Sequence, residues 1–227
     1  ALQRVAEVLD APQVGVGDSP TAAASEEKPS LVIEGLTVGW PGDQPVLSNV
    51  NLHVAAGESV AIVGRSGIGK TTLAATVMGL IPPLGGTVKT TGRVRYLAQN
   101  AHVFATSISE NVRIGCKEAT ESEVLAALDR AGLSMPPGRV IAEDGGTLSG
   151  GEAQRLALAR VLVSHDATVD PAAHDLLILD EPTEHLDVET SEALMDDLWA
   201  TTTNAAKVVI THDPLVMARC DRVWRIG

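Results

Sequence analysis

The 227-residue sequence has few cysteines and no spacing typical of a metal site. Its two cysteines, Cys116 and Cys220, lie far apart, and none of the six histidines pairs with another at i, i+4. A chain of this size with so few cysteines is more typical of a cytosolic protein with free thiols than of a domain held by disulfides. We therefore expect free thiols and identify no metal cage.

Basic residues are also few. The 17 Lys and Arg residues stand against 29 Asp and Glu, which gives a formal net charge of -12. Affinity for nucleic acid rests on clustered Lys and Arg that release counterions from the phosphates. The charge balance therefore argues against nucleic acid as a partner.

Long apolar runs are missing as well. The longest uncharged run lies between Lys70 and Lys89, and glycines and prolines interrupt it well before the roughly 20 apolar residues that a spanning helix needs. The sequence thus predicts no membrane-spanning helix. The chain begins at Ala1 without a signal-peptide pattern and ends at Gly227 directly after a predicted strand, and we interpret it as a piece of a longer protein.

Residues 1–30 differ in composition from the rest of the chain. Residues 1–10 carry apolar side chains at helical spacing, which predicts a short helix. Residues 11–30 are rich in glycine, proline and small polar residues without periodicity, a composition typical of a linker. The folded domain is expected to begin near Leu31.

The remaining sequence predicts an α/β fold. Alternating apolar residues in 31–40 and 46–54, separated by a Pro41-Gly42-Asp43 turn, predict antiparallel strands. Buried strands then alternate with helices, which implies a parallel sheet covered by helices. The predicted strands are 59–64, 93–97, 176–179 and 207–211, and the predicted helices are 70–80, 150–163, 187–199 and one opened by a Thr120–Glu123 capping box.

A glycine-rich loop between the first of these strands and its helix points to phosphate binding. Residues 64–71, Gly-Arg-Ser-Gly-Ile-Gly-Lys-Thr, match G-x-x-x-x-G-K-[ST] at every fixed position. Glycines let the backbone wrap the phosphates closely, with amide groups and the helix N-terminus facing the negative charge. Lys70 would reach the β and γ phosphates, and the Thr71 hydroxyl would bind Mg²⁺. A glycine-rich turn with a chance lysine is the alternative, and the strand-loop-helix context argues against it.

Two carboxylates follow the predicted strand at residues 176–179. Asp180 lies at the carboxyl end of that strand, where ligands collect in α/β sheets, and suits contact with Mg²⁺ directly or through water. Glu181 can orient or deprotonate an attacking water. Two solvated acids at the end of a strand are the alternative interpretation, but phosphoryl transfer needs both a metal-holding acid and a water-positioning group beside the phosphate loop.

Residues 148–155, Leu-Ser-Gly-Gly-Glu-Ala-Gln-Arg, resemble the signature motif of the ATP-binding domains of ABC transporters, with Glu at the usual Gln position. The resemblance covers about residues 31–227. It implies a P-loop NTPase (RecA-like) parallel-sheet core, an antiparallel β-subdomain and a helical ABC subdomain at about 100–148. It also implies that residues 1–30 are the end of a transmembrane-domain helix and a linker.

The family's other functional positions occur in the expected order. Gln99 resembles the glutamine that contacts Mg²⁺ and the attacking water, His212 the histidine that contacts the γ-phosphate, and residues 184–187 the loop that follows the paired carboxylates. Trp40 stands where the family places an adenine-stacking aromatic ring, although a tryptophan is more often a core residue.

The resemblance thus implies a site for ATP and Mg²⁺. The catalytic residues would be Glu181, His212 and Gln99, and the metal would be held by Thr71, Gln99 and Asp180. Nucleotide would be bound by Trp40, Gly64, Arg65, Ser66, Gly67, Ile68, Gly69, Lys70, Thr71 and Thr72, and by Ser149, Gly150 and Gly151 acting on ATP held by a second such domain.

Three segments resemble the exporter branch in particular: residues 2–10, 104–112 and 143–145. Residues 180–187 and the Gly-Gly-Glu signature are similar to the CydC-type subunit of CydDC exporters, a family linked to export of thiol reductants (cysteine, glutathione) or haem and to cytochrome bd assembly. That resemblance implies attachment to a transmembrane domain at the cytoplasmic face of the cell membrane and a heterodimer with a CydD-like partner. An exporter of another substrate (lipid, peptide or drug), a non-transport ABC ATPase and a poorly hydrolysing subunit remain as alternatives.

Overall fold

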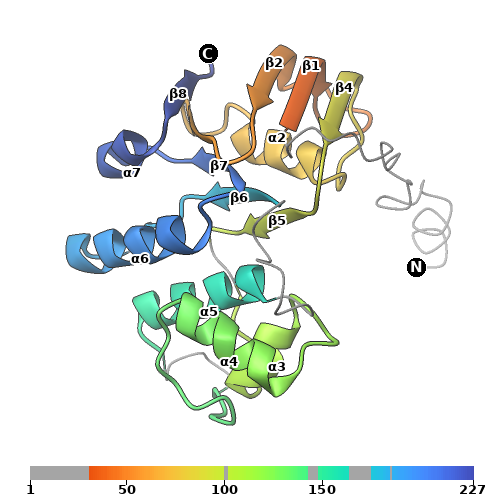
Figure 1. Ribbon diagram of the computed structural model, residues 1–227. Helices are drawn as coiled ribbons and strands as arrows, with labels where there is room; N and C mark the ends of the chain where they lie inside the picture. Colours follow the sequence, from red (N-terminus) through yellow and green to blue (C-terminus); the bar gives the residue numbers. More distant parts are fainter. Residues whose placement is uncertain (1–30, 100–101, 143–147, 164–174, 185) are drawn as a thin grey trace, which may run out of the picture.

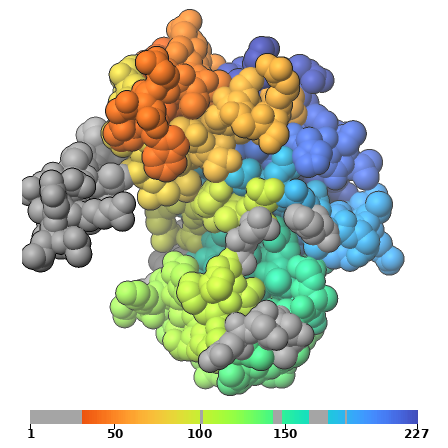
Figure 2. All heavy atoms as spheres, turned by 180° about the vertical axis from the view of Figure 1, so that it is seen from behind, coloured from red at the N-terminus to blue at the C-terminus, as the bar shows by residue number. Residues whose placement is uncertain are grey.

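The computed structural model describes residues 31–99, 102–142, 148–163, 175–184 and 186–227 (Figure 1). Several predicted features lie outside these residues: the helix and linker of residues 1–30, the exporter-like segment 143–145, and His185. The described chain forms an antiparallel sheet, a parallel sheet and a group of helices. Figure 2 shows the antiparallel strands at one end of the molecule and the green helices at the other.

The antiparallel sheet contains the predicted hairpin and one further strand. Strand β1 (Leu31–Val38) pairs with β2 (Leu47–Val54), as predicted. Strand β4 (Gly85–Thr90) pairs with the other edge of β1, giving the order β2-β1-β4. Strand β4 was not predicted, because its glycines and exposed residues lack the apolar alternation of a typical half-buried strand.

The parallel sheet has the order β5-β6-β7-β3-β8. Its strands are β3 (Ser59–Val63), β5 (Val94–Leu97), β6 (Leu176–Asp180), β7 (Ala206–Ile210) and β8 (Arg222–Arg225). Every residue of β3, β6 and β7 is buried, which explains why most of their residues are apolar. The α/β prediction is confirmed, and the carboxyl ends of these strands meet at one edge of the sheet.

The helices form two sets. Helices α2 (Lys70–Val77), α6 (Val188–Thr201) and α7 (Pro214–Arg219) follow strands of the parallel sheet. Helices α3 (Ile108–Arg113), α4 (Glu121–Arg130) and α5 (Gly150–Leu162) pack together below it (Figure 1). The predicted capping box of Thr120 and Glu123 is present at α4, and Asp187 caps α6 as predicted.

Two hydrophobic cores lie on opposite faces of the parallel sheet. Alternation along β6 divides its side chains between them: Leu176 and Ile178 join the core shared with α2 and the antiparallel sheet, whereas Leu177 and Leu179 join the core shared with α3–α5. Strand β5 alternates in the same way, with Tyr96 packed against the first core. Among the described residues, no helix combines the length and apolar character needed to cross a bilayer.

Candidate functional site

The glycine-rich loop connects β3 to α2, as predicted. Gly67 and Gly69 adopt φ values of 77° and 108°, in the left-handed region that favours glycine. A β-carbon at Gly69 would lie 2.9 Å from a methyl group of Val46, so packing also requires glycine there. The loop is therefore held against the end of the β1–β2 hairpin.

Lys70, the first residue of α2, turns its side chain back over this loop. Its Nζ donates hydrogen bonds to the carbonyl oxygens of Gly64 at 2.7 Å and Arg65 at 3.2 Å. The ammonium group thus lies inside the curve of the loop, beside the amide groups at the N-terminus of α2. This is an arrangement of positive charge and backbone donors suited to an anion.

A pocket of about 240 Å³ joins the loop to the carboxyl ends of the parallel strands. It brings together candidate site residues from three separate segments of the sequence, and Ile210 of β7 completes its lining. Its lining consists of Ser66, Gly67, Gly69, Lys70, Thr71, Thr72, Gln99, Asp180, Glu181 and Ile210.

Asp180, at the end of β6, is held by hydroxyl groups from two other elements. Its Oδ2 accepts hydrogen bonds from the Tyr96 hydroxyl at 2.9 Å and from Thr71 Oγ1 at 3.3 Å. Burial raises the pKa of the Asp180 carboxyl, and these two hydrogen bonds oppose the shift. Burial and the nearby Asp180 charge also raise the pKa of Tyr96, so its hydroxyl keeps its proton and remains a donor. Tyr96 was not among the residues predicted for the site.

Glu181 has a strained backbone and a directed side chain. Its φ is 47°, which is uncommon for a residue other than glycine, and its amide donates to the carbonyl oxygen of Ile210 at 2.9 Å. Its Oε1 lies 2.9 Å from Nδ1 of His212, which follows the neighbouring strand β7. The hydrogen bond with Glu181 raises the pKa of His212, whose side chain is mostly exposed. Strain of this kind gathers at functional sites.

Two glutamines connect this edge of the sheet to the segment after Glu181. Gln99 donates from Nε2 to a carboxylate oxygen of Glu184, and Gln154 of α5 donates to the carbonyl oxygen of Pro182 at 3.0 Å. Gln99 is exposed and lines the pocket, whereas Gln154 is buried. Gln99 thus lines the same pocket as Asp180 and Glu181.

The oxygen atoms around the pocket fit a magnesium ion. Thr71 supplies a hydroxyl, Asp180 a carboxylate and Gln99 a side-chain amide, and all three line the same pocket. Hard oxygen donors of this kind are the ligands that Mg²⁺ prefers, commonly with only one or two carboxylates from the protein. The donor set thus suits Mg²⁺ bound together with phosphate oxygens.

Trp40 lies in the turn between β1 and β2. Its side chain is 57% exposed, and its carbonyl oxygen accepts a hydrogen bond from Asp43 at 3.0 Å. The same turn leads to Val46, which packs against Gly69. Trp40 does not line the 240 Å³ pocket itself, and its ring is exposed.

The signature residues lie in a second hollow. Ser149, Gly150 and Gly151 line a hollow of about 670 Å³, together with Leu133 and Asp187. Within this chain they do not join the phosphate-loop pocket. Ser149 forms a capping box in which its Oγ accepts from the Glu152 amide at 3.2 Å and the Glu152 carboxylate accepts from the Ser149 amide at 2.6 Å.

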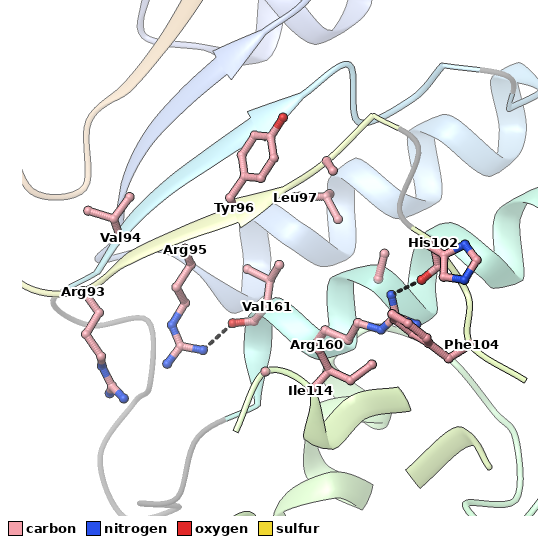
Figure 3. Close-up of a pocket in the computed structure, with 13 residues that line it drawn as sticks. Arg93, Val94, Arg95, Tyr96, Leu97, His102, Phe104, Ile114, Arg160 and Val161 are labelled. Carbon is pink, nitrogen blue, oxygen red and sulfur yellow. Dashed lines mark hydrogen bonds between the residues drawn. The ribbon is translucent and has the colours of Figure 1, made fainter. Parts of the chain in front are cut away.

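A third hollow, of about 610 Å³, lies between β5 and the helices (Figure 3). Arg95 donates there to the carbonyl oxygen of Val163 at 2.8 Å, and Arg160 lies over the ring of Phe104 at 5.7 Å from its centre. This hollow was not predicted from the sequence, although Phe104 belongs to the exporter-like segment 104–112. It forms only when β5 and α5 come together, so no local pattern reveals it.

The chain is similar to known proteins along most of its length. A family model described as ABC transporter matches residues 47–184. The mycobactin import ATP-binding/permease protein IrtB of Mycolicibacterium smegmatis is 33% identical over 98% of this chain and 40% of the relative. The glutathione/L-cysteine transport system ATP-binding/permease protein CydD of Bacillus subtilis is 30% identical over 98% of this chain and 41% of the relative. The chain thus spans about two fifths of these relatives.

The fold is also found in a solved structure. A bacterial Atm1-family ABC exporter with ATP bound matches with a TM-score of 0.82 and 26% sequence identity. The match covers 100% of this chain and 42% of that one.

Proposed function

Since the chain belongs to the ABC transporter family and has the ATP-hydrolysing domain of its exporters, we propose that it powers the export of a substrate through a transmembrane domain. The observation that carries this proposal is the single pocket shared by Lys70, Gln99, Asp180 and Glu181. It combines a phosphate cradle, oxygen ligands and a candidate base, which are the parts that phosphoryl transfer needs.

Each candidate site residue has a separate task in this proposal. The amide groups of residues 64–72 and the Lys70 ammonium bind the phosphates, and Trp40 stacks on the adenine ring. Thr71, Asp180 and Gln99 would hold Mg²⁺, which supplies positive charge beside the phosphate oxygens when it is bound. Glu181 orients a water and takes its proton. His212, hydrogen-bonded to Glu181, orients that carboxylate and reaches the γ-phosphate.

The second hollow suggests how two such domains cooperate. We assign Ser149, Gly150 and Gly151 to the γ-phosphate of an ATP held by a partner domain, because the N-terminus of α5 offers amide donors and a helix dipole. Their separation from the phosphate-loop pocket of the same chain supports this assignment. ATP binding would then close a pair of domains and hydrolysis would reopen it.

For the whole protein, we propose a CydC-type half-transporter. In this assignment residues 1–30 connect to a transmembrane domain, residues 31–227 are the nucleotide-binding domain, and residues 100–148 are its helical lobe. The protein would lie at the cytoplasmic face of the cell membrane, paired with a CydD-like subunit, and would export thiol reductants or haem in support of cytochrome bd assembly. The sequence of residues 180–187 and the similarity to a CydD protein support this assignment.

Transport into inverted membrane vesicles tests the proposal. Vesicles that contain the full-length protein and its partner subunit should take up cysteine or glutathione only when ATP is present, and Glu181→Gln should abolish the uptake. ATP-dependent uptake of a lipid or peptide but of neither thiol would contradict the CydC-type assignment. ATP hydrolysis without transport of any of these would favour a non-transport ATPase.

A further inference from the structure

Tyr96 connects β5, an edge strand of the parallel sheet, to the Asp180 carboxylate at the end of the neighbouring strand β6. Tyr96 pairs with Ile178 in the parallel register of β5 and β6, and Asp180 lies two residues beyond Ile178 on the same face of β6. Figure 3 shows the Tyr96 ring on the opposite side of β5 from Arg93 and Arg95. The hydroxyl therefore points toward the pocket edge of the sheet, away from the hollow between β5 and the helices.

The hydrogen bonds to Asp180 are unevenly distributed between its two oxygens. Both the Tyr96 hydroxyl, at 2.9 Å, and Thr71 Oγ1, at 3.3 Å, donate to Oδ2. Within the described part of the chain, Oδ1 accepts no hydrogen bond from another side chain. Asp180 is 4% exposed, so solvent does little to set the orientation of its carboxylate. The two hydroxyls do so instead.

Of these two donors, Tyr96 is the one outside the nucleotide machinery. Thr71 belongs to the phosphate loop and is itself a candidate metal ligand. Tyr96 lies on a strand that does not contact the loop through any hydrogen bond among the described residues, and its ring is fixed by packing against the core shared with α2. A rigid donor on a second element is the usual means by which a ligand carboxylate is oriented before the metal arrives.

We propose that Tyr96 is a positioning residue for magnesium binding, because its hydroxyl fixes the Asp180 carboxylate and leaves Oδ1 for the metal. Mg²⁺ demands near-ideal octahedral geometry, so a carboxylate free to rotate would bind it less well. The inference rests on the proposed function, since it needs ATP to bring the metal. It adds a residue that acts on the metal through Asp180, without touching ATP.

The test is the effect of Tyr96→Phe on the magnesium dependence of ATP binding by the 227-residue chain. Phenylalanine keeps the ring and removes only the hydroxyl. In EDTA, Tyr96→Phe should bind a fluorescent ATP analogue with wild-type affinity. When Mg²⁺ is added, the Mg²⁺ concentration that gives half of the increase in ATP affinity should be about tenfold higher for the variant than for wild type. Thr202→Val is the matched control. It removes a buried hydroxyl that donates to the carbonyl oxygen of Leu198 at 2.6 Å, and neither residue lines the pocket. It should lower the unfolding midpoint without changing the Mg²⁺ dependence.

The outcomes separate a positioning role from a structural one. Equal Mg²⁺ dependence in Tyr96→Phe and wild type would overturn the inference and leave the proposed function intact. Equal loss of affinity with and without Mg²⁺ would make Tyr96 a packing residue only and would also overturn it. A wild-type chain that binds no ATP would overturn the proposed function, and the inference with it.

Discussion

Nδ1 of His212 lies 2.9 Å from Oε1 of Glu181. This contact links the residues that follow β6 and β7, two neighbouring strands of the parallel sheet. The hydrogen bond raises the pKa of His212 above its ordinary value. The pair is therefore a carboxylate with an imidazole that is readily protonated, placed at the edge of the phosphate-loop pocket.

The first prediction concerns the pKa of His212. Glu181→Gln should lower it toward the ordinary value of about 6.5, because the glutamine carries no charge. Since the folded-state pKa is raised, the pair stabilises the fold below the unfolded pKa, and this contribution is lost as pH rises through the folded pKa. NMR titration of the imidazole in both proteins measures the shift. An unchanged pKa would show that the two side chains do not interact in solution.

The second prediction concerns the strain at Glu181. Its φ of 47° suits glycine better than any residue with a β-carbon. Glu181→Gly should therefore be about 1 kcal/mol more stable than Glu181→Ala, although both lose the carboxylate. Urea unfolding compares the two variants directly. An alanine variant as stable as the glycine variant would argue against backbone strain at this position.

Features of the site that are encoded in one continuous stretch of sequence were predicted, and features that arise from pairing between distant strands were not. The loop at residues 64–71 was found because strand, glycines and helix follow one another in the chain. The hydrogen bond of Tyr96 was missed because it depends on the parallel pairing of β5 with β6. Tyr96 and Asp180 are separated by 84 positions in the sequence. Strand β4 was missed for a similar reason: its identity comes from pairing with β1, and its own glycines and exposed side chains look like a loop.

The third prediction assigns separate effects to two capping boxes. Ser149→Ala and Thr120→Ala should each lower the free energy of unfolding by about 1 kcal/mol, because each removes an N-cap hydroxyl. Only Ser149→Ala should also reduce ATP turnover in the assembled transporter, since only Ser149 is assigned to a partner's ATP. Neither change should alter ATP affinity in the separate chain. Equal turnover in the two variants would remove Ser149 from the ATP site.

The fourth prediction tests Trp40 as the adenine contact. Trp40→Ala should weaken ATP binding by a few-fold to about tenfold, as expected if about 1 kcal/mol of stacking is lost. Trp40→Phe should retain most of the affinity, because an aromatic face remains. Calorimetric titration with ATP gives both values. Unchanged affinity in Trp40→Ala would mean that the exposed ring has another role.

If Glu181 is the base of an ATP-hydrolysing site, Glu181→Gln should separate ATP binding from ATP turnover. Both are measured in wild type and in the variant, using the full-length protein with its partner. The variant should bind ATP with normal affinity, lose turnover and accumulate in the closed, ATP-bound dimer. Near-normal hydrolysis by Glu181→Gln would contradict this role of Glu181.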